Sequence, residues 1–344
     1  MIYHLFELLS DYDIPGQRLM GYLSFRAMLA FVTAMLISFF AGRRIIRWLQ
    51  KKQIGETIRD LGLEGQMQKK GTPTMGGVII LLAILVSALL FCDLTNIYTQ
   101  LLIFTTVWCG GIGFADDYIK VFKHDKEGMS ERGKLILQVV LGCIVGLTVC
   151  FNNDIVIREK VRIEADADST HYLPQGSENV DVDSETIVSQ SGWKMENIIK
   201  STKTTLPFIK AHEFDYKWLS PFSGKWGWYC KWAIYVIMIV IVITACSNGT
   251  NLTDGMDGLA AGTSAIVGIV LGILAWLSGN LINSNYLDIM YIPGTGEIAV
   301  FMSIFVGALL GFLWYNSYPA QVFMGDTGSL AIGGIIGVSA ILLR

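Results

Sequence analysis

Residues 19–41, LMGYLSFRAMLAFVTAMLISFFA, decide the fold class. The stretch is long enough to cross the roughly 30 Å hydrocarbon core of a bilayer as an α-helix. Its one charged residue, Arg26, lies near the start, and we expect its long side chain to snorkel to the membrane surface. The stretch therefore predicts a membrane-spanning helix.

Further apolar stretches follow along the chain, and 52% of all residues are hydrophobic. Charged residues lie mostly between these stretches, which is typical of a polytopic membrane protein. We therefore predict an all-α integral membrane protein with about eight transmembrane helices. The later spans are expected at residues 78–91, 101–115, 135–150, 232–245, 259–278, 298–315 and 330–343. Three regions result: 1–151 with helices one to four, 152–231 as an insertion, and 232–344 with helices five to eight.

The loop after the first span is strongly basic, with Lys or Arg at positions 43, 44, 47, 51, 52, 59, 69 and 70. By the positive-inside rule this loop is cytoplasmic, so the N-terminus lies outside. The alternation of spans then predicts that all the motif-like connections lie on the cytoplasmic face. These are KKGTPTMGG (69–77), DDYIK (116–120), NLTDGMDGLA (251–260) and NSYPAQVFMGDTGS (316–329).

The insertion, residues 152–231, falls outside the membrane by parity. Its stretch IVIREKVRIEADA (155–167) alternates well enough for a pair of strands, which predicts a small β-rich extracytoplasmic module. Trp226, Trp228 and Trp232 near its end are typical of an interfacial aromatic belt. Nothing in the insertion indicates catalysis.

Two carboxylates in the third connection, Asp254 and Asp257, follow a long apolar run. If the next helix includes Asp254, the three-residue spacing places both carboxylates on one face together with Asn251. Three polar side chains would then converge at the membrane surface, which indicates a functional site. The alternative is a helix cap, for which one such residue suffices.

Carboxylates, lysines and glycine turns on one face suit a phosphorylated substrate held through a divalent cation. Mg²⁺ takes few protein carboxylates and keeps places for water and phosphate oxygens, and Asp326 in FMGDTGS is the favoured ligand. Lysines 69, 70, 120 and 134 either compensate phosphate charge or form a solvated basic face. Phe323 either stacks on a nucleotide base or anchors the chain at the lipid interface. Asn316 either caps the preceding span or lines the site.

Together, KKGTPTMGG, FADDYIK, NLTDGMDGLA and YNSYPAQVFMGDTGS resemble, in order and topology, the motifs of the polyprenyl-phosphate hexosamine-1-phosphate transferases. The resemblance covers residues 20–344 except the insertion and is nearest to the muramoyl branch of that family. It implies transfer of phospho-MurNAc-pentapeptide from UDP-MurNAc-pentapeptide to undecaprenyl phosphate with Mg²⁺, giving lipid I and UMP in peptidoglycan synthesis. It also implies a bacterial inner-membrane protein in the lipid bilayer with a cytoplasmic active site. A homodimer is one possibility, and no nucleic acid is expected.

The resemblance also implies roles for individual residues. Asp116 is similar to the acidic residue proposed as base on the lipid phosphate, Asp117 is its neighbour in the motif, and Asp326 is similar to the magnesium aspartate. The implied substrate-binding set is Lys69, Thr74, Lys134, Asn251, Asp254, Asp257, Asn316 and Phe323, with Phe323 against the uracil. We expect direct in-line attack by the lipid phosphate, in competition with a two-step route through an aspartyl phosphate on Asp326 or Asp117.

The sequence departs from this family in two places. Family members continue past the eighth span through two more helices joined by a His-rich loop, whereas this sequence ends at Arg344, which predicts a fragment or a divergent product. His124 stands where the family leads us to expect a basic residue, and a histidine changes charge near neutral pH.

Two other functions compete with the muramoyl transferase. The nearest is a sister transferase that moves GlcNAc-1-phosphate from UDP-GlcNAc, and which shares the aspartates and the metal; GTPTMGG and NLTDGMDGLA favour the muramoyl branch. A transporter is a different class, because intramembrane carboxylates also mark ion paths. The carboxylates here lie at the ends of spans, and no internal repeat supports a carrier.

Overall fold

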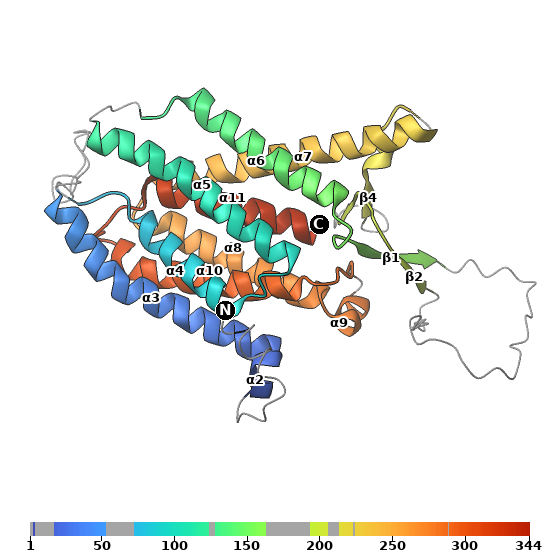
Figure 1. Cartoon of the computed structure of the whole chain (residues 1–344), viewed down its shortest axis with the longest axis horizontal. Coiled ribbons are helices and arrows are strands. Elements are labelled where there is room, and N and C mark those ends of the chain that lie inside the picture. The colour runs from blue at the N-terminus through green and yellow to red at the C-terminus, as the bar shows by residue number, and fades with distance from the viewer. Residues whose placement is uncertain are drawn as a thin grey trace, which may run out of the picture.

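The computed structural model describes residues 3, 17–52, 72–123, 128–162, 193–205, 213–222, 224–287 and 289–344. In this part of the chain, long apolar helices form an elongated bundle (Figure 1). They are α3 (Leu23–Lys51), α4 (Gly77–Phe91), α5 (Ile97–Phe122), α6 (Glu131–Phe151), α7 (Gly224–Thr253), α8 (Leu259–Ser278), α10 (Gly296–Asn316) and α11 (Gly325–Leu343). The short helices α2 (Gln17–Gly21) and α9 (Leu281–Tyr286) lie at one end of the bundle.

The polytopic all-α prediction is confirmed. Among the described residues, seven helices are long and apolar enough to cross a membrane, and α4 is a shorter apolar helix of 15 residues. Seven of the eight predicted spans lie within one of these helices, and the first, residues 19–41, begins in α2 and continues in α3. Helices α3, α5 and α7 extend well past the predicted apolar stretches, because their polar ends continue the backbone hydrogen-bond ladder.

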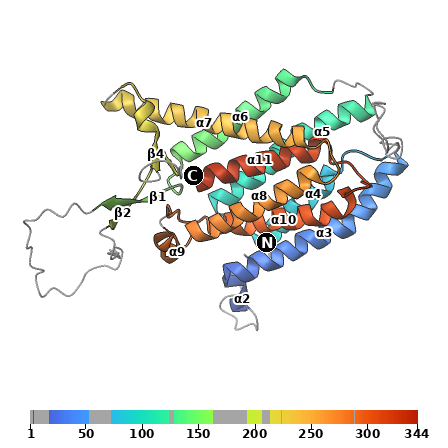
Figure 2. The ribbon, with the colours of Figure 1, turned by 180° about the vertical axis from the view of Figure 1, so that it is seen from behind.

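Helices α10 and α11 form the centre of the bundle, where α10 packs against α3 and α8, and α11 packs against α5 and α7 (Figure 2). Glycines allow close contact between backbones at these crossings. A Cβ atom on Gly307 of α10 would lie 2.3 Å from the carbonyl oxygen of Phe31, and one on Gly333 of α11 would lie 2.3 Å from that of Cys246. Small residues stabilise membrane helix pairs in this way, because dispersion contacts rather than water exclusion drive their association.

Arg26 does not snorkel to the membrane surface as predicted. It is 5% exposed and forms an ion pair with Glu297 in the first turn of α10. The second carboxylate oxygen of Glu297 accepts the backbone N–H of Asp93 at 2.9 Å. The prediction was wrong because a buried carboxylate from a distant part of the sequence replaces water as the partner of the guanidinium.

The predicted β-rich insertion is present in the described residues as two small antiparallel sheets. Strand β1 (Ile157–Arg162) pairs with β2 (Trp193–Ile199), and β3 (Lys203–Thr205) pairs with β4 (Glu213–Asp215). The partner of β1 therefore comes from later in the insertion and not from the same alternating stretch. The 3₁₀ turn η2 (Tyr216–Leu219) follows β4.

The end of the insertion lies earlier than predicted, because α7 already begins at Gly224. Two of the three predicted interfacial tryptophans, Trp226 and Trp228, are 77% and 47% exposed near the start of α7. Trp232 is 4% exposed and packs edge-on against the ring of Tyr235, so it does not belong to an exposed belt.

Candidate active site

Asp116 is a fully buried carboxylate near the end of α5. Its Oδ2 lies 2.6 Å from the Nζ atom of Lys120, one helical turn later, and its Oδ1 lies 2.9 Å from the Nζ atom of Lys134 in α6. Its Oδ1 also accepts the backbone N–H of Met129 at 2.7 Å. Two ammonium groups and one amide thus compensate a charge that would be costly to bury alone.

Asp326 lies in the first turn of α11, and its carboxylate forms ion pairs with the same two lysines, Lys120 and Lys134. Its Oδ2 is 2.7 Å from the Nζ atom of Lys134 and 3.2 Å from that of Lys120. Both lysines therefore bridge the carboxylates of Asp116 and Asp326, which come from different helices. A negative charge at this position also interacts favourably with the N-terminal end of the α11 dipole.

Asp117, the neighbour of Asp116, makes a different set of contacts. Its carboxylate accepts the backbone N–H groups of Asp326 at 3.2 Å and Thr327 at 2.9 Å, and the hydroxyl of Thr327 at 2.6 Å. The residue before α11, Met324, makes no side-chain capping bond. Asp117 therefore caps α11 from another helix, as a side-chain carboxylate does at an N-cap position.

Two glycines make this crossing of α5 and α11 possible. A Cβ atom on Gly113 of α5 would lie 2.1 Å from the carbonyl oxygen of Asp326. Gly325 has a φ of +74°, in the left-handed region, and a Cβ atom there would lie 2.7 Å from the Oδ2 atom of Asp117. The carboxylates meet only because neither position carries a side chain.

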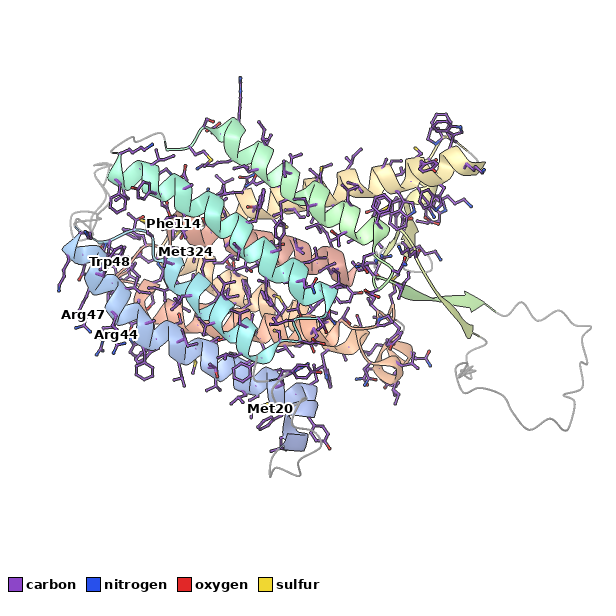
Figure 3. The ribbon with its side chains drawn as sticks, viewed as in Figure 1. Met20, Arg44, Arg47, Trp48, Phe114 and Met324 are labelled. Atoms are coloured by element: carbon purple, nitrogen blue, oxygen red, sulfur yellow. The ribbon has the colours of Figure 1, made fainter. Side chains whose placement is uncertain are left out.

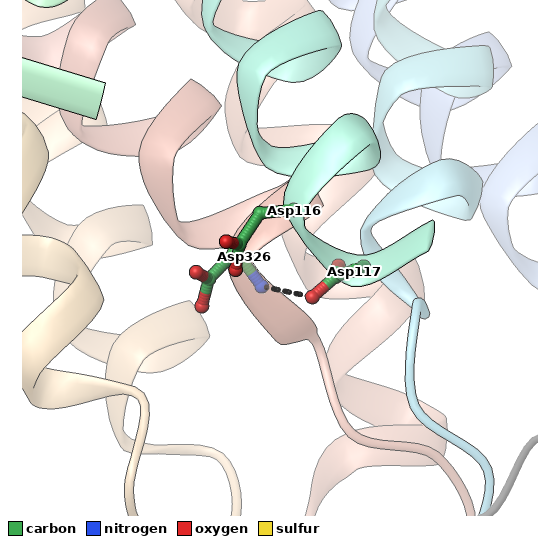
Figure 4. A group of neighbouring side chains, drawn as sticks. All are labelled: Asp116, Asp117 and Asp326. Atoms are coloured by element: carbon green, nitrogen blue, oxygen red, sulfur yellow. Dashed lines mark hydrogen bonds between the residues drawn. The ribbon is translucent and has the colours of Figure 1, made fainter. Parts of the chain in front are cut away.

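The three aspartates form a group that suits a metal ion. Each offers one oxygen, and these oxygens lie within 4.8 Å of one another. Figure 4 shows Asp117 directed at the backbone nitrogen of Asp326. The ion pairs of Asp326 with Lys120 and Lys134 engage its Oδ2 atom, whereas both oxygens of Asp116 are engaged. Three carboxylates and two ammonium groups leave one negative charge. An all-oxygen donor set with this charge fits a hard divalent cation such as Mg²⁺.

The described part of the first predicted connection, residues 72–77, lies alongside the segment that precedes α11. Phe323 donates its backbone N–H to the carbonyl oxygen of Pro73 at 2.9 Å, and Gly76 donates to the carbonyl oxygen of Phe323 at 2.8 Å. Thr74 and Phe323 are half-buried in these paired segments. Lys69, Lys70 and His124 lie outside the described residues.

The third connection is a turn and not a continuous helix. Helix α7 ends at Thr253, and α8 begins only at Leu259, after Gly258 with a φ of +75°. The expected single helical face through Asp254 and Asp257 is therefore wrong, because the intervening glycines favour a turn. Asp254 and Asp257 are half-buried in this turn.

Three polar residues fix the third connection against its neighbours. Asn251 accepts the hydroxyl of Ser329 at 2.9 Å, and the Oδ2 atom of Asp257 accepts the backbone N–H of Ala320 at 3.2 Å. Asn316 is buried and uses both ends of its amide: its Oδ1 accepts the N–H of Gly258 at 3.1 Å, and its Nδ2 donates to the carbonyl oxygen of Val322 at 2.9 Å. The side-chain bonds of Asn316 therefore join the third and fourth connections, and neither of them goes to a carbonyl group at the end of α10.

The structure adds contacts that sequence reasoning did not assign. Lys120 was named only among the lysines that could compensate phosphate charge, although its spacing of four residues from Asp116 signals a contact on one helix face. Thr327 and the backbone N–H of Met129 carried no signal, because their roles depend on a helix crossing and on a turn.

Comparisons with known proteins identify the class of this chain. The family model for Glycosyl transferase family 4 matches residues 194–344, and the model "Phospho-N-acetylmuramoyl-pentapeptide-transferase signature 1" matches residues 69–81. The fold and the site thus define a multi-pass membrane protein with a glycosyl transferase family 4 region.

Similar proteins of known name identify the family within this class. The chain is 51% identical over its whole length to the phospho-N-acetylmuramoyl-pentapeptide-transferase of Parabacteroides distasonis, and covers 77% of that protein. It is 52% identical to the protein of the same name from Flavobacterium psychrophilum, again over the whole chain and 80% of the relative. The Bacteroides fragilis protein is 50% identical, with 77% covered. The chain belongs to the phospho-N-acetylmuramoyl-pentapeptide-transferase family.

Proposed function

We propose that this protein transfers phospho-MurNAc-pentapeptide from UDP-MurNAc-pentapeptide to undecaprenyl phosphate, which produces lipid I and UMP. The observation that carries the proposal is the pair of lysines shared between Asp116 and Asp326, two carboxylates that come from the second and fourth predicted motif connections. The names of the relatives support the same activity. As the first membrane step of peptidoglycan synthesis, it would serve cell wall growth, cell shape and cell division.

The chemistry requires charge compensation more than covalent catalysis. An oxygen of the lipid phosphate attacks the β-phosphorus of the UDP-sugar, and the bond from that phosphorus to the oxygen bridging to the α-phosphorus breaks, so that UMP leaves with the bond electrons. Lys120 and Lys134 are held where they neutralise phosphate oxygens during the transfer. Asp116 accepts or excludes the last proton of the lipid phosphate.

Magnesium is the cation that we assign to the carboxylate of Asp326. When bound, Mg²⁺ supplies Lewis-acid polarisation of the pyrophosphate oxygens. Asp117 is already engaged by three hydrogen bonds from α11, so its role is to hold the first turn of that helix and thereby the carboxylate of Asp326.

The nucleotide is assigned to the turns around this cluster. Thr74, Asp254 and Phe323 are half-buried on neighbouring segments, so each residue is partly exposed to solvent. Asn251, Asp257 and Asn316 support these segments through the hydrogen bonds described above. Lys69 belongs to the proposed set through its motif alone, and Phe323 is proposed to contact the uracil.

We assign the site to the cytoplasmic face of a bacterial inner membrane. Figure 3 shows Arg44 and Arg47 at the same end of the bundle as Phe114 and Met324, with Met20 at the opposite end. Exposed basic residues at the end of α3 favour the cytoplasmic side. A nucleotide-linked substrate made in the cytoplasm would reach the site directly from there.

Turnover of two UDP-sugars by the purified protein in lipid nanodiscs tests this proposal. UDP-MurNAc-pentapeptide with undecaprenyl phosphate and Mg²⁺ should yield UMP and lipid I, and UDP-GlcNAc should yield neither. Product from UDP-GlcNAc alone would instead identify the sister transferase. A phosphorylated enzyme trapped from the UDP-substrate without lipid acceptor would refute direct attack in favour of the two-step route.

A further inference from the structure

A chain of polar side chains crosses the apolar bundle one helical turn away from Lys134. Gln138 follows Lys134 by four residues on α6 and is 1% exposed. It faces Ser247 and Asn248 on α7, and Ser247 is fully buried. Such groups are costly among apolar helices unless they are satisfied, so their position requires an explanation.

Gln138 and Asn248 form a reciprocal amide pair. The Nε2 atom of Gln138 donates to the Oδ1 atom of Asn248 at 3.2 Å, and the Nδ2 atom of Asn248 donates to the Oε1 atom of Gln138 at 2.8 Å. The Nε2 atom of Gln138 also donates to the hydroxyl oxygen of Ser247 at 3.2 Å. The pair therefore specifies one register between α6 and α7.

The same chain continues from α7 to α11. The hydroxyl of Ser247 donates to the carbonyl oxygen of Leu330 at 3.2 Å, and Asn251 accepts the hydroxyl of Ser329 at 2.9 Å. Ser329 lies three residues after Asp326, which places it on the same face of α11. Polar contacts thus connect the helix of Lys134 to the helix of Asp326.

The packing of α6, α7 and α11 relates these polar contacts to the position of Lys134. Helix α6 packs mainly on α7, and α7 packs on α11, with close backbone contacts at Gly142 and Gly333. The 2.7 Å contact between Lys134 and Asp326 therefore depends on the packing of α6 on α7, in addition to the contact of α6 with α5, where the Nε1 atom of Trp108 donates to the carbonyl oxygen of Leu137 at 3.0 Å. Apolar surfaces tolerate sliding, but a slide of one residue, about 1.5 Å along the axis, would break both bonds of the amide pair.

We propose that Gln138 and Asn248 are positioning residues, which hold α6 in the register that places the Lys134 ammonium between Asp116 and Asp326. They touch no substrate and act through Lys134. A test by enzyme activity rests on the proposed function. Chemical labelling of Lys134 does not require activity, so it can show that the inference fails even if the proposed function is correct, and the reverse.

The test compares Gln138→Met and Asn248→Leu, which keep the side-chain volume but remove the amide pair, with the exchanged double variant Gln138→Asn/Asn248→Gln. Thr148→Val is the matched control. It removes a hydroxyl bond to the carbonyl oxygen of Ile144 within α6, at a position away from the side-chain amide of Asn248. UMP release gives kcat and KM, and thermal unfolding monitors folding. Reactivity of Lys134 toward an amine reagent, read by mass spectrometry against exposed Lys225, needs no turnover.

We expect each single variant to lower kcat by about 10- to 100-fold and to change KM little, since a misplacement of about 1 Å has effects of this size. Lys134 should become more reactive while Lys225 does not change, the exchanged double variant should recover much of the lost rate, and Thr148→Val should match the wild type. In a Lys134→Met background, Gln138→Met should have almost no further effect.

Unchanged Lys134 reactivity in both single variants would overturn the inference, whatever the turnover. So would an additive loss of kcat when Gln138→Met is combined with Lys134→Met, because a residue that acts through Lys134 cannot matter after its removal. If wild-type protein showed no turnover but Lys134 became more reactive in the variants, the inference would stand and the proposed function would fail.

Discussion

Substitution of Gly113 by alanine tests whether the close crossing of α5 and α11 assembles the carboxylate cluster. The added Cβ atom would lie 2.1 Å from the backbone oxygen of Asp326, about 1.3 Å closer than ordinary van der Waals contact, which begins at 3.4 Å. The neighbouring atom belongs to the backbone, so it cannot rotate away. The two helices must separate or shift, and Asp116 and Asp117 would move with α5.

The magnitude follows from this displacement. Overpacking of this kind costs about 1–3 kcal/mol of stability, which exceeds the benefit of about 1 kcal/mol that alanine brings over glycine inside a helix. A displacement of about 1 Å at the reacting groups is expected to lower kcat by about 100-fold. Gly111→Ala is the matched control, because a Cβ atom there has nothing within 4 Å.

The assay is UMP release by both variants in the same lipid, with thermal unfolding measured in parallel. Gly111→Ala should match or slightly exceed the wild type in stability and should retain its turnover. Gly113→Ala should be less stable and nearly inactive. If Gly113→Ala retained turnover within about threefold of Gly111→Ala, the view that this crossing positions the carboxylates would be refuted.

Further perturbations address separate parts of the structure. Thr327→Val removes the 2.6 Å hydroxyl bond to Asp117, and should lower kcat by at least about 10-fold, since bonds to charged groups contribute about 1.5–3 kcal/mol; wild-type kcat would exclude the capping role. Lys134→Met should reduce kcat/KM more than Lys134→Arg, and equal losses would argue against a charge role. Arg26→Met should destabilise folding by about 3–5 kcal/mol because it leaves the buried carboxylate of Glu297 without its cationic partner, yet the folded fraction should keep its kcat; an unchanged melting temperature would contradict this. EDTA should abolish turnover and Mg²⁺ should restore it, whereas turnover that survives chelation would exclude a required metal.

The helices and the meeting of the motif segments could be predicted from the sequence, because both depend on local properties. The length of an apolar stretch identifies a membrane span. Because successive spans run in opposite directions, the connections before α4 and α11 lie at the same end of the bundle. Hydrogen bonds between Pro73 and Phe323 and between Asp257 and Ala320 confirm that these connections meet.

Contacts between distant helices could not be predicted in the same way. The burial of Arg26 depends on Glu297, and the capping role of Asp117 depends on a crossing permitted by Gly113. The turn after Thr253 formed where a helical face was expected, because spacing alone does not reveal where glycines end a helix. The partner of strand β1 likewise lies far along the insertion.

Asp326 is held between two lysines and supported by Asp117, and we propose that it makes this bundle a metal-dependent phospho-sugar transferase. The most direct measurement is lipid I formation from UDP-MurNAc-pentapeptide and undecaprenyl phosphate over a range of Mg²⁺ concentrations, with wild type and Asp326→Asn compared in the same nanodiscs. We predict Mg²⁺-dependent product from the wild type and a loss of at least about 1,000-fold in the variant, comparable to the loss of a major electrostatic group in an active site. Wild-type rates of lipid I formation by Asp326→Asn would contradict the account.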